Sequence, residues 1–206
     1  MSFYSFTFLF DYSGFKEKIS PALDALVIGN SDELQQMAVD LTKENPKIWD
    51  FVGYSRVPLY DDDLEKGLDD VVNAGVLHWL LLVIFNYCSN FSRDNHFADS
   101  EILRQVGIDD VIIDMLKNPK PLGDLLINIS PKIIPTSYMD GNFNINKCPL
   151  YWLSVDEVGK IKTAIQTNVK QTNVKQTNTH SLDGLLAMLN NAVDSNKTLL
   201  TGFWFN

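Results

Sequence analysis

Four residues that could do chemistry lie close together in the middle of the chain: Arg93, Asp94, His96 and Asp99. A histidine among carboxylates can bind a metal ion or act as a general base. The spacing Asp-x-His-x-x-Asp is not a known metal-ligand spacing, however, and no HExxH motif or cysteine pair completes it. A solvated loop with a helix cap at Asp99 or Ser100 explains the same residues. Both interpretations stay open.

The stretch from Asp140 to Tyr151 resembles the start of a calcium-binding loop. The oxygen ligands of such a loop alternate, as four residues do here: Asp140, Asn142, Asn144 and Asn146. The pattern then fails, because Ile145 stands where glycine is required and Tyr151 where the bidentate glutamate is required. A turn-rich loop explains the stretch, with residues 140–146 as an alternative lid over the first cluster. No metal ligand, catalytic residue or cofactor is assigned.

The two cysteines, Cys88 and Cys148, are not expected to act as nucleophiles. A catalytic thiol needs a base within hydrogen-bonding reach. The closest candidate, His78, precedes Cys88 by ten residues on one expected helix, which separates them by about 15 Å. Cys148 has no local activator, and two cysteines do not make a disulfide framework, so both thiols are expected to be reduced. Phosphate-binding and nucleophile-elbow motifs are absent from the sequence.

The composition indicates a folded acidic protein. Hydrophobic residues make up 45% of the 206 residues, which argues against disorder. The net charge of −9 argues against nonspecific binding to nucleic acid or anionic lipid, because both need clustered Lys and Arg. The longest apolar run, Val76 to Phe85, is shorter than the ~20 residues of a membrane span. The amino terminus lacks the features of a signal peptide, so a cytoplasmic location is expected.

Both ends of the sequence predict strands. Aromatic residues occupy every second position in Phe3 to Phe10, and the segment Lys197 to Asn206 alternates in the same way. Two such strands at opposite ends of the chain are expected to lie in one sheet.

The sequence between them is mainly helical in pattern. A capping box, Ser154-x-x-Glu157, marks the start of one helix. Residues 119–149 are rich in Pro, Asn and Gly and predict a long ordered loop with one short strand. The other expected helices are Ser31–Lys43, Asp61–Asn73, Val76–Phe91, Asp99–Val106, Asp109–Lys117 and Ser181–Ser195. The fold class predicted is α+β, a mainly helical single domain (residues 1–206) with a small sheet containing the N- and C-terminal strands.

Residues 166–180 read QTNVK-QTNVK-QTNTH. A period of five fits neither a helix nor a strand, so successive valines cannot share an apolar face. The repeat predicts an in-frame expansion of a surface loop, with the preceding helix extending a turn into it. Deletion of residues 166–175 is then expected to leave the melting temperature almost unchanged, and a dedicated binding arm is the alternative.

The ends of the chain resemble an uncharacterised bacterial family. The opening "MSFYSFTFLFD" is similar to members that begin M-S-Y and enter a strand ending in an acidic residue. "CPLYWLSVDEV" and the closing "LLTGFWF" are similar to its late Pro-aromatic stretch and its final G-F strand. A fainter likeness is to the YfbM-like proteins. The resemblance implies a bacterial cytosolic α+β protein and assigns no residue a role.

Two functions follow as hypotheses. The first is a non-catalytic protein-interaction module with a basic protein partner, of which an immunity or antitoxin-like protein is one form. The alternative is a small enzyme, or a small-molecule or metal binder, with a loop-built site around residues 93–99 and 140–146. The sequence does not indicate the oligomeric state.

Overall fold

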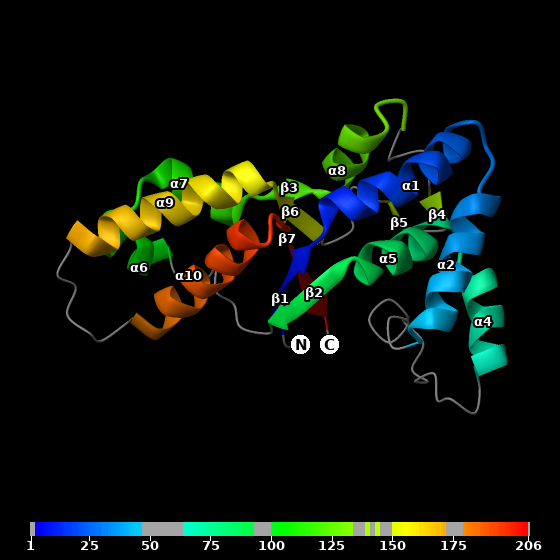
Figure 1. Ribbon diagram of the computed structural model, residues 1–206, viewed down its shortest axis with the longest axis horizontal. Coiled ribbons are helices and arrows are strands. Elements are labelled where there is room, and N and C mark those ends of the chain that lie inside the picture. The colour runs from blue at the N-terminus through cyan, green and yellow to red at the C-terminus, as the bar shows by residue number, and fades with distance from the viewer. Residues whose placement is uncertain are drawn as a thin grey trace. The chain divides into compact units, whose positions relative to one another are not determined.

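The structure is a computed structural model that confirms an α+β fold, mainly helical with a small sheet (Figure 1). It describes residues 3–46, 64–92, 100–133, 139–140, 143–144, 150–171 and 179–205. By its internal contacts the chain separates into two compact units. Unit 1 comprises Met1–Asp11, Ser89–Pro121 and Pro149–Asn206, and unit 2 comprises Tyr12–Cys88 and Leu122–Cys148. Whether they form one domain, as the sequence predicts, stays a prediction.

The sheet has the strand order β2-β1-β7-β6-β3. The terminal strands β1 (Phe3–Phe10) and β7 (Thr198–Phe205) pair antiparallel, with Phe3 opposite Phe205 and Phe10 opposite Thr198. This confirms that both terminal strands lie in one sheet. β7 also pairs antiparallel with β6 (Leu150–Leu153), which pairs with the short β3 (Lys120–Pro121). β2 (Cys88–Ser92) forms the other edge.

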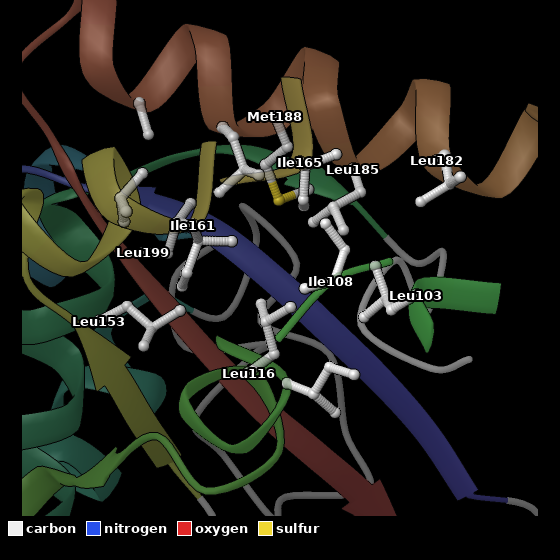
Figure 2. Packing of buried hydrophobic residues seen from close by; sticks show 14 of the residues in the cluster. Leu103, Ile108, Leu116, Leu153, Ile161, Ile165, Leu182, Leu185, Met188 and Leu199 are labelled. Carbon is white, nitrogen blue, oxygen red and sulfur yellow. The ribbon is translucent and has the colours of Figure 1, made fainter. Parts of the chain in front are cut away.

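Unit 1 packs its helices on one face of this sheet. They are α6 (Ser100–Gln105), α7 (Asp110–Lys117), α9 (Val155–Gln171) and α10 (Thr179–Asp194). Figure 2 shows their apolar side chains converging with Leu153 and Leu199 of the sheet. Three residues of α9, Val158, Ile161 and Ile165, are fully buried there. Their spacing of three and four residues places them on one helical face.

The helix ends in unit 1 follow from local chemistry. The capping box is present: Ser154 N–H and Oγ donate to Glu157 Oε2 at 2.9 and 2.8 Å, and Glu157 N–H donates to Ser154 Oγ at 3.3 Å. α6 and α7 are separated at Gly107, as the sequence predicts, and this glycine has φ +79°. There Gly107 N–H donates to Arg104 O and Ile108 N–H to Leu103 O, which ends α6 in a left-handed turn.

Unit 2 is built around α5 (Val76–Asn86), whose side chains are buried on most sides. α1 (Tyr12–Val27) and α2 (Asp32–Glu44) pack against α5, and α4 (Leu64–Val72) packs against α2. Trp79 of α5 is 7% exposed, and its Nε1–H donates to Val71 O at 2.6 Å. The unit also contains α8 (Leu122–Ile129) and the strand pair β4 (Met139–Asp140) and β5 (Phe143–Asn144).

Three expectations about secondary structure were incomplete or wrong. The helix α1 was not predicted, although five of its residues form an apolar face: Phe15, Ile19, Ala22, Leu23 and Leu26. The helix expected over Val76–Phe91 ends at Asn86, and the chain then enters β2. The expected loop at residues 119–149 contains α8, with Leu122, Leu125 and Leu126 fully buried.

The repeat was expected to be a surface loop over residues 166–180, extended by a turn of the preceding helix. The structure places Gln166–Gln171 in α9, and α10 begins at Thr179. Gln166 is half-buried, and its Nε2–H donates to Asn190 Oδ1 at 3.3 Å. The helical part of the repeat is therefore longer than one turn, while residues 172–178 lie outside the described ranges.

Candidate functional site

The four residues of the first candidate site, Arg93, Asp94, His96 and Asp99, lie outside the described residues. Of the calcium-like stretch, Asp140 and Asn144 belong to the strand pair β4–β5, where Asp140 lies opposite Phe143. Asn142 and Asn146 lie outside the described ranges. Within the part of the chain that the structure describes, no group of three His, Cys, Asp or Glu side chains could hold a metal ion.

The distance expected between His78 and Cys88 assumed that both residues lie on one helix. His78 is half-buried on α5, but Cys88 is the first residue of β2 and does not continue that helix. The Cys88 thiol donates to Ile84 O at 3.4 Å. Cys148 lies outside the described residues. The separation of about 15 Å along one helix therefore no longer applies.

A partly exposed ionic contact in unit 1 joins β3 to the start of α9. Lys120 Nζ lies 2.8 Å from Glu157 Oε1 and 5.1 Å from the ring centroid of Trp152. Burial raises the pKa of the Glu157 carboxyl, but hydrogen bonds from Lys120 and Ser154 outweigh burial and hold the pKa below its ordinary value. Every partner in this contact also holds an element in place, so we assign it to the fold.

The negative charge of the protein is concentrated in unit 2. The two segments of this unit contain 15 Asp and Glu against 8 Lys and Arg, a net charge of −7. Unit 1 contains 11 against 9, a net charge of −2. All of the excess in unit 2 lies in Tyr12–Cys88, which contains 13 Asp and Glu against 6 Lys and Arg, whereas Leu122–Cys148 contains 2 of each kind. Sequence reasoning missed the asymmetry because the bounds of the units follow from contacts that the sequence alone does not show. The acidic run Asp61–Asp70, within the helix expected over Asp61–Asn73, was the available signal.

An acidic stripe runs along α2 and consists of Glu33, Asp40 and Glu44, all of which are exposed. Their spacing of seven and four residues places them on one side of the helix. Gln36 lies on the same side, and its Nε2–H donates to Asp40 Oδ1 at 2.9 Å. This hydrogen bond, aided by Lys43 at 3.3 Å, lowers the pKa of Asp40 from its ordinary value. The lowered pKa favours the ionised form of Asp40 at neutral pH.

The helix next to α2 carries further exposed carboxylates. Asp69 and Asp70 lie near the end of α4 and are exposed. Gln35 Nε2–H donates to Val72 O at 2.8 Å, which fixes the end of α4 beside the first turn of α2. The helix pair therefore presents fixed negative charge from two packed elements.

Among the helices of the described ranges, none is long and apolar enough to cross a membrane. Comparisons with protein-family models, with curated proteins and with solved structures found no match.

Proposed function

We propose that the chain is a non-catalytic protein-interaction module that binds a basic protein through unit 2. The observation that carries this proposal is the net charge of −7 on unit 2 against −2 on unit 1. Exposed carboxylates on α2 and α4 bring part of this charge to the surface. Complementary charge increases the rate at which a basic partner associates and disfavours acidic competitors.

The finer form of the proposal is an immunity or antitoxin-like protein of a bacterial cytoplasm. A basic toxin would be covered by the acidic surface, and nucleic acid would be repelled by it. The resemblance of the chain ends to an uncharacterised bacterial family supports the bacterial cytosolic part of this proposal. Producing the captured partner in bacterial cells, alone or together with this chain, tests the immunity proposal. An immunity protein restores the growth of cells that produce its toxin.

The first experiment is affinity capture from a lysate of the source organism, with identification by mass spectrometry. The captured partner is then titrated against purified variants at low and high salt. We expect Glu33→Gln combined with Glu44→Gln to weaken binding by about tenfold. The loss should shrink in high salt, since the screening length falls from about 8–10 Å at 0.1–0.15 M salt to about 3 Å at 1 M.

A matched control removes two exposed carboxylates from unit 1 instead, with Asp156→Asn and Asp183→Asn. Both pairs change the net charge by the same amount. Equal weakening by the two pairs would show that only total charge matters, and no dependence on either pair or on salt would contradict the proposal.

The alternative function, a small-molecule or metal site around residues 93–99 and 140–146, stays a prediction. The four residues at its centre lie outside the described ranges, and no observation in the described part of the chain favours it.

A further inference from the structure

The first copy of the repeat, Gln166–Lys170, makes specific contacts. Gln166 Nε2–H donates to Asn190 Oδ1 of α10 at 3.3 Å. Two residues later, Asn168 Nδ2–H donates to Ala164 O at 3.1 Å. A Cβ placed on Gly107 would lie 4.0 Å from Asn168 Oδ1, so this amide lies against the turn between α6 and α7. The copy directly follows Ile165, which is fully buried.

Two contacts fix how α9 and α10 face each other. Gln166 meets Asn190, and Lys162 Nζ lies 3.7 Å from Asp194 Oδ1. From Lys162 to Gln166 the chain advances four residues on α9, while the contacting residue on α10 moves back four, from Asp194 to Asn190. The two helices are therefore antiparallel. In this register Asn168 lies beside Met188, and the buried Leu182 lies six residues nearer the start of α10. Six residues of helix span about 9 Å.

The residues directly after Ile165 stay the same when the number of repeat copies changes. All three copies begin Gln-Thr-Asn. Removal or insertion of any whole copy therefore leaves Gln-Thr-Asn directly after Ile165. The residue types that contact Asn190 and the Gly107 turn are restored whichever copy is lost or gained.

The reach of the connection sets a lower limit on copy number. Helix axes that pack side by side lie about 8–10 Å apart, so Asn168 and Leu182 are separated by about 13 Å. Thirteen residues join them in the natural chain, eight would remain after loss of one copy, and three after loss of two. Three residues reach about 13–14 Å only when fully extended. The first turn of α10 would then have to unwind.

We infer that the repeat is a connection of adjustable length between α9 and α10. Its first copy is an anchor that packs on the core of unit 1, and the copies after it are a spacer. The number of copies can rise, or fall by one, while the core stays unchanged. Loss of two copies shortens α10. This replaces the expectation that deletion of residues 166–175 leaves the melting temperature almost unchanged.

The test is a series of full-length chains with one to five copies, compared by thermal unfolding. Chains with two, four and five copies are expected to melt within about 2 °C of the natural chain, because loop closure depends weakly on length. The single-copy chain is expected to melt at least about 5 °C lower, since Leu182 loses its burial. An equally stable single-copy chain, or a similar loss on going to two or four copies, would overturn the inference.

Matched substitutions test the anchor separately from the spacer. Gln166→Ala, Gln171→Ala and Gln176→Ala change the same residue type in nearly the same local sequence. Only Gln166→Ala is expected to lower the melting temperature, by about 2 °C, and only this change should be non-additive with Asn190→Ala. Additivity at Gln166, or equal losses at the three positions, would show that the first copy is no anchor.

Discussion

Glu157 shows how one side chain serves two purposes in this fold. Its carboxylate completes the capping box of α9 and also accepts from Lys120 of β3. The helix start and the sheet edge therefore depend on the same charge. Because the pKa of this carboxyl is lower in the folded chain than in the unfolded chain, its ionisation stabilises the fold.

The charge of Glu157 is predicted to give a pH-dependent stability. Its contribution is fully present above the unfolded pKa, near 4.3, and is lost as the pH falls through the lower folded value. We expect Glu157→Gln to reduce the free energy of unfolding by about 1–2 kcal/mol at neutral pH. In urea titrations this deficit should shrink between about pH 5 and pH 3. Asp156→Asn, the exposed neighbour, is the control, and a deficit independent of pH would contradict the assignment.

Asn196 ends α10 with a left-handed backbone, at φ +53°. Its N–H donates to Val193 O, and Lys197 N–H donates to Ala192 O, which closes the last turn. We predict that Asn196→Ala lowers the free energy of unfolding by about 1 kcal/mol, whereas Asn196→Gly changes it by less than about 0.5 kcal/mol. Both variants delete the same exposed side chain, so chemical denaturation isolates the backbone strain. Equal effects would show that the side chain itself is responsible.

At the scale of elements, α8 offers a sharp test because two adjacent residues differ strongly in burial. Leu126 is fully buried and Ile127 is 41% exposed. We expect Leu126→Ala to cost about 2–5 kcal/mol and Ile127→Ala less than about 1 kcal/mol, as measured by urea unfolding. Similar costs at the two positions would contradict the helical packing of this segment.

The elements that sequence reasoning recovered are those whose signal is local. The capping box marks the start of its helix within four residues of sequence. The alternation of aromatic residues in β1 can likewise be recognised without knowing which strand pairs with it. α1 and α8 carry a comparable apolar period, but Pro21 inside α1 and the prolines around α8 masked it.

The boundary between α5 and β2 could not be predicted in the same way. Residues 84–92 read IFNYCSNFS, with no Gly or Pro to mark a helix end. The chain leaves the helix there because β2 pairs beside β1, about eighty residues earlier in the sequence. The concentration of charge in unit 2 was missed for a related reason, since the bounds of the two units follow from long-range contacts that the sequence alone does not show.

At the scale of the whole molecule, the chain passes between the two units four times, after residues 11, 88, 121 and 148. Neither unit is therefore a continuous piece of chain. We predict a single cooperative unfolding transition, as expected for one domain. Trp79 reports on unit 2 and Trp152 on unit 1, and both are buried.

Variants that keep only one of these tryptophans, with the others replaced by phenylalanine, provide the measurement. Their fluorescence in urea should give the same midpoint, after correction for the stability of each variant. Two midpoints that remain separate would show that the units unfold independently and that the single-domain prediction is wrong.

The pairing of β1 with β7 also affects how the protein is made. Synthesis proceeds from the amino end at about 5–20 residues per second, so β1 leaves the ribosome roughly 10–40 s before its partner strand exists. Throughout that interval β1, a strand rich in aromatic residues, has no β7 to pair with, although in the folded chain the two strands pair from Phe3 with Phe205 to Phe10 with Thr198. The pairing of β1 with β7 can form only after β7 has been synthesised. Until then, β1 of a nascent chain is open to pairing with strands of other nascent chains, and folding must avoid that pairing.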